Sequence, residues 1–212
     1  MNRVAWGYGT PRTVRPLWAI IELGLVYDHK KILPRGQGME DPAFRALSGR
    51  HKIPFYQDDR VTMGESAAIV NYLADRYGTD ALSMPAPGTK ERAILQDYTM
   101  FIMTEIDARL YGVRLHDEPP GGLSSIYGSA PVAVDAAKHY AARGLREAAR
   151  WFNGDEHFAL GGRFTTVDIL LVSCLDWALL YGLELPAPLE EYRNRIALRP
   201  GYLQAMAENK PS

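Results

Sequence analysis

The alternation of apolar and polar positions divides the chain into two parts. The N-terminal part mixes short β-like runs with helical stretches, whereas the C-terminal part shows helical periodicity almost throughout. Three breaker residues, Pro85, Pro87 and Gly88, lie between the two patterns. The pattern predicts an N-terminal domain at residues 1–79, a linker at residues 80–88 and an all-helical domain at residues 89–212.

Within the N-terminal part the apolar spacing predicts seven short elements in the order βαβαββα. That order is typical of a small α/β sandwich. Pro16 must lie in the first turn of its helix, because proline has no N–H and clashes with the carbonyl four residues earlier. Thr13 is then the expected N-cap, with Pro16 at N3. The predicted elements are a strand at Arg3–Tyr8, a helix ending near Gly24, a strand at Val26–Ile32, a helix beginning at Pro42, strands at Pro54–Gln57 and Arg60–Met63, and a helix at Ser66–Tyr77.

The C-terminal part is predicted to contain long helices with apolar residues at a period of 3.6. The third long helix carries few charges, so we expect it to be buried. The predicted helices are Thr89–Leu115, Val132–Phe152 and Thr165–Tyr181, followed by short helices at Leu189–Ala197 and Gly201–Glu208.

Composition narrows the possible functions. The 212 residues include 24 Lys and Arg against 25 Asp and Glu, and the absence of a basic block argues against nucleic acid as the main partner. The apolar runs are too short for a membrane span, and no secretory signal is visible, so a cytoplasmic protein is expected. The single cysteine, Cys174, excludes an internal disulfide, and the five histidines lack paired ligand spacing, so no metal is implied.

The pattern richest in possible chemistry joins Lys52-Ile53-Pro54 to Glu65-Ser66. A cis X-Pro bond at the start of a strand would expose the preceding backbone N–H and C=O to an extended peptide. A helix beginning at Ser66 would offer free N–H groups and a hydroxyl to a carboxylate, and Glu65 could hold an ammonium. Spacing alone favours a simpler interpretation, in which Pro54 is an edge-strand proline and Ser66 a helix cap.

This segment resembles the glutathione-binding half of the cytosolic glutathione S-transferases. In that family an Ile/Val-cis-Pro pair contacts the cysteinyl backbone of glutathione, and a Glu/Gln-Ser pair at this spacing binds its γ-glutamyl end. Residues 4–27 are similar to the family's first βαβ unit, and Gly161–Ile169 matches its capping motif in the helical domain. The three motifs occur in the family's order and spacing. The loop at Thr10 resembles that of a bacterial subgroup of the family.

The resemblance implies a thioredoxin-like N-terminal domain followed by an all-α domain, with glutathione as co-substrate. It implies that Ile53 and Pro54 bind the tripeptide backbone and that Glu65 and Ser66 bind its γ-glutamyl end. Thr165 and Asp168 need no catalytic role, because a capping Thr with an acidic residue three positions later stabilises a helix start.

The residue that activates the glutathione thiol is expected in the loop after the first strand. Thr10 aligns with the serine of the serine-type classes and with the threonine of a bacterial Thr-Pro-Asn subgroup, in which Arg12 takes the Asn position. Tyr8 and Thr13 are the alternatives. The loop has no cysteine, which argues against the mixed-disulfide chemistry of the omega and beta types.

Two parts of the site are less well defined by the resemblance. Met39-Glu40 stands where the family often has a cation for the glycyl carboxylate, and Lys52 or His51 could replace it. The electrophile pocket should be lined by the first half of the long helix, although aromatic and Met residues at helical spacing are usually core. The available side chains there are Tyr98, Met100, Phe101, Met103 and Tyr111.

The sequence therefore predicts a glutathione transferase that conjugates the glutathione thiolate to a small, mostly apolar electrophile. The family is usually homodimeric, and the resemblance implies a homodimer here. Two alternatives stay open. One is a glutathione-dependent disulfide reductase or peroxidase on the same fold, and the other is a non-catalytic interaction module.

Overall fold

The computed structural model describes residues 2–152 and 156–211 and divides into two compact units. The first unit comprises residues 1–84, 163–169 and 196–212, and the second comprises residues 85–162 and 170–195. The C-terminal helix thus packs with the N-terminal unit. The linear domain boundaries expected from composition stay a prediction.

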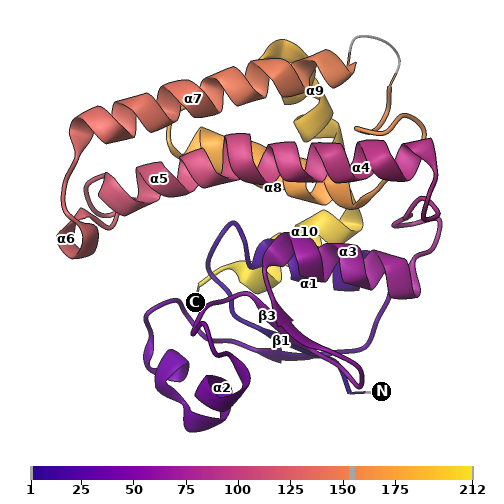
Figure 1. Ribbon diagram of the computed structural model, residues 1–212, viewed down its shortest axis with the longest axis horizontal. Helices are drawn as coiled ribbons and strands as arrows, with labels where there is room; N and C mark the ends of the chain where they lie inside the picture. Colours follow the sequence, from indigo (N-terminus) through magenta and orange to yellow (C-terminus); the bar gives the residue numbers. More distant parts are fainter. Residues whose placement is uncertain (1, 153–155, 212) are drawn as a thin grey trace. The chain divides into compact units, whose positions relative to one another are not determined.

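The first unit is built on a four-stranded mixed sheet in the order β2-β1-β3-β4 (Figure 1). Strand β1 (Val4–Trp6) pairs parallel with β2 (Asp28–Lys30) and antiparallel with β3 (Phe55–Gln57), which pairs antiparallel with β4 (Thr62–Gly64). Together with its helices this is a thioredoxin-like domain, and it confirms the predicted βαβαββα order.

Successive side chains along a strand point to opposite faces of the sheet, and they show that α2 and α3 cover opposite faces. Trp6 and Phe55 are paired in register and point to the face covered by α2 (Pro42–Leu47), where Phe44 lies 5.4 Å and 5.9 Å from their rings. The next residue along β3, Tyr56, points to the other face and packs against Tyr72 of α3 (Ser66–Tyr77). Helix α1 (Val14–Glu22) packs beside α3.

Helix α10 (Pro200–Asn209) packs along α1 within the first unit. The indole of Trp18, which is fully buried, meets the Tyr202 ring at 5.1 Å. The Glu22 carboxylate accepts two hydrogen bonds from the Arg199 guanidinium, at 2.9 and 2.7 Å, and a third from the Trp18 Nε1–H at 2.9 Å. These contacts hold the start of α10 against the end of α1, so the two helices run antiparallel and the end of α10 lies near the start of α1.

The second unit is helical, which confirms the predicted class of the C-terminal domain. The predicted helix over Thr89–Leu115 is interrupted by a π-helical segment at Ile102–Asp107. Among the residues proposed for the electrophile pocket, Tyr98 stacks on Trp151 at 3.7 Å, whereas Met100 is 63% exposed. The helices are α4 (Lys90–Phe101), α5 (Ala108–His116), α6 (Ser124–Tyr127), α7 (Pro131–Ala149), α8 (Thr166–Leu180) and α9 (Ala187–Ile196).

Two short 3₁₀ helices, Gln37–Glu40 and Arg150–Phe152, complete the secondary structure of the described residues. Within residues 2–152 and 156–211, every helix is too short or too polar to cross a membrane.

Candidate functional site

A cavity of about 620 Å³ lies within the first unit, at the start of β3, along β4 and at the start of α3. The peptide bond between Ile53 and Pro54, just before β3, is cis, as the resemblance implied. Glu65 and Ser66, which join β4 to α3, face the same cavity. The cavity is within the usual size range of small-molecule sites. Of the predicted glutathione-binding residues, it is lined by Arg12, Lys52, Ile53, Pro54, Glu65 and Ser66.

Ser66 is the first residue of α3 and is 3% exposed. Because a helix start leaves the N–H groups of its first turn without intrahelical carbonyl partners, N–H groups are available to a ligand beside Ser66. The Ser66 hydroxyl accepts a hydrogen bond of 3.0 Å from the guanidinium of Arg15, a residue of α1 that is fully buried. The Ser66 hydrogen can therefore be donated into the cavity, next to the positive end of the α3 dipole.

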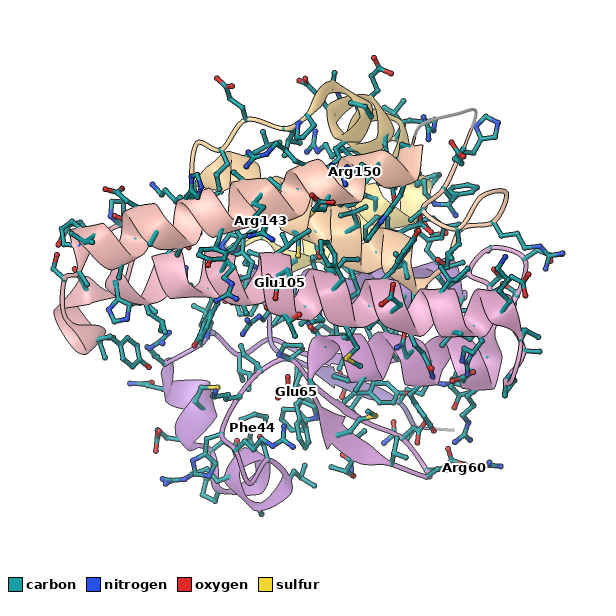
Figure 2. All side chains as sticks on the ribbon, turned by 45° about the horizontal axis from the view of Figure 1, so that its top comes forward. Phe44, Arg60, Glu65, Glu105, Arg143 and Arg150 are labelled. Carbon is teal, nitrogen blue, oxygen red and sulfur yellow. The ribbon has the colours of Figure 1, made fainter. Side chains whose placement is uncertain are left out.

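Glu65 adopts a positive φ of 66°, a backbone conformation uncommon for a residue with a side chain. Figure 2 labels it at the start of α3. Its carboxylate pairs with the Arg50 guanidinium at 2.8 Å, and both side chains are largely exposed. Because exposed ion pairs contribute little stability, a ligand ammonium could replace Arg50 at Glu65 at small cost.

Three cationic side chains, Arg12, Arg50 and Lys52, line the cavity, against the single carboxylate of Glu65. Arg50 was not identified from the sequence, because nothing in its local pattern connects it with Glu65. Glu40 pairs with Arg45 at 2.8 Å, and His51 is exposed and does not line the cavity. The excess positive charge suits a ligand that carries more than one carboxylate.

The loop after β1 contains the residues proposed to activate a thiol. The Thr10 hydroxyl accepts a hydrogen bond of 3.0 Å from the Thr13 N–H, and the Thr13 hydroxyl accepts one of 3.0 Å from the Thr10 N–H. Neither Thr10 nor Tyr8 is among the residues that line the cavity; of this loop only Arg12 is. The structure thus joins Arg12 to the predicted binding residues and leaves the choice between Thr10 and Tyr8 open.

Thr13 occupies the N-cap position of α1, with Pro16 at N3 as predicted, but its side chain makes no capping hydrogen bond. The reason is that Pro16 offers no N–H at N3, so the hydroxyl is free for tertiary contacts. It donates instead to Oδ1 of Asn209, at 2.7 Å, from the end of α10. Sequence reasoning missed Asn209, which is 196 residues away in the chain.

Thr165 and Asp168 form a compact cap at the start of α8. The Asp168 carboxylate accepts from the Thr165 N–H at 2.7 Å and from the Thr165 hydroxyl at 3.0 Å, and Asp168 is fully buried. These two hydrogen bonds are local to the helix start. Across the described residues, no three His, Cys, Asp or Glu side chains come together in a group that could hold a metal ion.

Comparison with known proteins connects this site with one family. Residues 8–81 match the family model described as the glutathione S-transferase N-terminal domain. A stretch of 91 residues is 34% identical to glutathione S-transferase 3 of Schizosaccharomyces pombe, covering 43% of this chain and 36% of that protein. The matched stretches span about a third of the length of the curated relatives.

Solved structures extend the similarity to the whole chain. A theta-class glutathione S-transferase from Xanthomonas axonopodis pv. citri with glutathione bound is 25% identical, with a TM-score of 0.79 over 96% of both chains. A glutathione transferase homologue from Lodderomyces elongisporus, with two glutathione molecules per subunit, is 17% identical. Its TM-score is 0.86 over 99% of this chain and 100% of that one. The second likeness concerns the fold alone.

Proposed function

Because the chain belongs to the glutathione S-transferase family, we propose that it binds glutathione in the cavity beside Ser66 and conjugates it to a small electrophile. The observation that carries this proposal is the arrangement of three different recognition elements around one cavity. These are the backbone at the cis Ile53–Pro54 bond, the buried hydroxyl of Ser66 at a helix start, and the Glu65 carboxylate among cationic side chains.

Each part of glutathione has a chemically matched partner. The γ-glutamyl carboxylate would accept hydrogen bonds from the Ser66 hydroxyl and from N–H groups of the first turn of α3. Its ammonium would pair with Glu65, and the cysteinyl backbone would pair with the N–H and C=O of Ile53. Lys52, with Arg12 on the same cavity, would supply a cation for the glycyl carboxylate in place of the polar pair that the sequence lacks before Pro42, and Arg50 could join them once the ligand ammonium takes its place at Glu65.

The chemical step requires the thiol of glutathione to ionise. A free thiol has a pKa of about 8.5, so a site that works near neutral pH must favour the thiolate. We assign this role to the Thr10 hydroxyl, with Tyr8 as the alternative, helped by the N-terminus of α1. With 1-chloro-2,4-dinitrobenzene, the sulfur would form a bond to the ring carbon, chloride would leave with its bonding electrons, and the thiol proton would pass to solvent.

The same bound thiolate could instead attack sulfur or oxygen in a disulfide or peroxide. Cys174 is fully buried, so this chain would contribute no exposed thiol of its own to such a reaction. Parallel assays with 1-chloro-2,4-dinitrobenzene, a glutathione mixed disulfide and a hydroperoxide distinguish the two activities. We also propose a homodimer, as in the family, which sedimentation of the purified chain tests directly.

Calorimetric titration with glutathione tests the binding proposal. We expect saturable binding below about 1 mM, and Ser66→Ala should weaken it about tenfold, because one charge-assisted hydrogen bond is lost. Ser125→Ala, at an exposed serine of α6, is the matched control and should bind like the wild type. Absence of binding at millimolar glutathione would overturn the proposal and favour a non-catalytic interaction module.

A further inference from the structure

Asn209, the last residue of α10, makes hydrogen bonds to the proposed activating loop through its side-chain amide and its backbone carbonyl. Its Oδ1 accepts hydrogen bonds from the Gly9 N–H at 3.1 Å and from the Thr13 hydroxyl at 2.7 Å. Its Nδ2 donates to the Thr10 carbonyl at 2.9 Å, and its own carbonyl accepts from the Gly9 N–H at 2.9 Å. Asn209 is 9% exposed.

Backbone groups fix which way the Asn209 amide points. The Gly9 N–H can only donate and the Thr10 carbonyl can only accept, so Oδ1 must face Gly9 and Nδ2 must face Thr10. The opposite orientation would place two donors together on one side and two acceptors together on the other. The orientation of the Asn209 amide is therefore fixed, and it determines which neighbouring hydroxyl groups donate and which accept.

This orientation decides where the hydrogen of the Thr13 hydroxyl goes. Oδ1 of Asn209 can only accept, so the contact of 2.7 Å must be donated by Thr13, whose hydroxyl has one hydrogen. The other acceptor within reach, the Thr10 carbonyl at 2.9 Å, already accepts from Nδ2 of Asn209 and from the Val14 N–H at 3.4 Å, so both of its lone pairs are occupied. In the 3.0 Å contact between the two threonine hydroxyls, Thr13 can then only accept.

The same reasoning leaves the Thr10 hydroxyl with the one movable hydrogen. Its oxygen already accepts from the Thr13 N–H at 3.0 Å, and its hydrogen points to the Thr13 oxygen in the absence of a ligand. Rotation about one bond turns this hydrogen from a neutral oxygen to any anion placed beside the loop. A hydrogen bond to an anion is stronger than one between neutral groups.

We propose that Asn209 is a positioning residue for thiol activation: it commits the Thr13 hydrogen to itself and so leaves the Thr10 hydroxyl as a donor for the glutathione sulfur. This inference rests on the proposed function. Asn209 touches neither substrate nor sulfur, and it acts through Thr13 and the Thr10 carbonyl. The C-terminal helix thereby takes part in the chemistry of a loop that lies near the start of the chain.

The test measures ionisation of bound glutathione in variants of the full chain. The apparent pKa of the bound thiol is obtained from the pH dependence of kcat/KM for the electrophile at saturating glutathione and from the ultraviolet absorbance of the thiolate. In Asn209→Ala we expect this pKa to rise by about one unit toward the free value, with a loss of activity of about tenfold near neutral pH that is recovered in alkali. Affinity for S-methylglutathione, which has no thiol, should stay within about twofold of the wild type.

Two further variants keep the test decisive if Asn209→Ala folds poorly. Thr13→Val removes the hydroxyl that Asn209 orients and should raise the thiol pKa in the same direction, whereas Thr13→Ser keeps the hydroxyl and should restore the wild-type profile. Leu203→Ala, at a side chain of α10 that is 56% exposed, controls for general effects of mutating this helix and should leave the pH profile unchanged.

The outcomes separate this inference from the function on which it rests. If wild-type protein fails to bind glutathione, both are wrong. If Thr10→Val raises the thiol pKa but folded Asn209→Ala and Thr13→Val keep the wild-type value, the proposed function stands and the role of Asn209 is refuted. If Asn209→Ala weakens binding of S-methylglutathione and thiol ionisation is unaffected, the residue is structural only and the inference again fails.

Discussion

The buried guanidinium of Arg15 donates a hydrogen bond of 3.0 Å to the hydroxyl of Ser66, joining the first turns of α1 and α3. The bond fixes the Ser66 oxygen as an acceptor toward the interior, so its hydrogen faces the cavity. It also brings a positive charge close to the place where a ligand carboxylate would bind. Arg15 is therefore expected to influence a ligand that it does not contact.

We predict that Arg15→Met weakens binding of S-methylglutathione at least about tenfold, since hydrogen bonds from charged groups contribute about 1.5–3 kcal/mol. Arg15→Lys keeps the charge and should lose less. Isothermal titration calorimetry measures both, and the thermal midpoint of each variant shows whether it is folded. Arg60→Met, at an exposed arginine in the β3–β4 turn (Figure 2), is the matched control. Wild-type affinity in folded Arg15→Met would contradict the prediction.

Gly7, immediately after β1, is predicted to tolerate no side chain, because of its neighbour Ile53. Its φ is +101°, and a Cβ atom there would lie 2.6 Å from the Cβ of Ile53. Gly7→Ala should cost about 3 kcal/mol from the combined clash and backbone strain, and it should displace Ile53 from the cavity. Urea unfolding and glutathione titration check the two effects.

Gly24→Ala provides the control for backbone strain alone. Gly24 also has a positive φ, +61°, but a Cβ atom there meets nothing within 4 Å. This variant should lose about 1 kcal/mol of stability and keep full affinity for glutathione. Equal binding by both alanine variants would show that the contact between Gly7 and Ile53 does not shape the site.

Elements with a strong local signal were predictable from the sequence. The helix at Ser66–Tyr77 was predicted with its observed bounds, because an amphipathic run ends at Gly78. The strands were predicted in the right order but one to four residues too long. Their ends carry apolar residues that are also compatible with extended loops, so hydrophobicity alone does not mark where pairing stops.

Tertiary relationships in the site could not be read from local patterns. Arg15 meets Ser66 across 51 residues and Asn209 meets Thr13 across 196, and neither residue type signals its partner by spacing. Thr13 was only partly predictable. Its position as N-cap follows from the sequence, but the hydrogen bond that its hydroxyl makes depends on Asn209, which is distant in the chain. The π-helical segment at Ile102–Asp107 also escaped prediction, because the apolar spacing there still fits a continuous helix.

Asp168 is predicted to be a major determinant of stability for α8. Its carboxylate accepts from both the N–H and the hydroxyl of Thr165 in a fully buried position. Asp168→Ala should lower the free energy of unfolding by about 2 kcal/mol, and Asp168→Asn should lose less because one acceptor oxygen remains. Thermal and urea unfolding measure the change. Asp135→Ala, on the exposed surface of α7, is the control, and an unchanged midpoint in Asp168→Ala would refute the prediction.

Asp58, in the turn between β3 and β4, is predicted to make the free energy of unfolding depend on pH. Burial is the largest influence and raises its pKa, but hydrogen bonds from the Arg60 and Val61 N–H groups and from the Tyr72 and Tyr77 hydroxyls outweigh it. Together they lower the pKa of Asp58 to about 2. A carboxyl with a lowered pKa stabilises the fold above its unfolded pKa of about 3.9, and this contribution is lost as the pH falls toward the folded value.

Asp58→Asn should therefore lower the free energy of unfolding by about 2 kcal/mol at neutral pH, and this difference from the wild type should shrink between about pH 4 and pH 2. Urea unfolding across that range measures it. The neighbouring Asp59 is the matched control. Its carboxylate is 44% exposed and pairs with Arg76 at 2.9 Å, so Asp59→Asn should cost about 0.5 kcal/mol or less. If the Asp58→Asn difference were the same at pH 3 as at neutral pH, the charge of Asp58 would not be what stabilises the turn, and its shape alone would have to account for the loss.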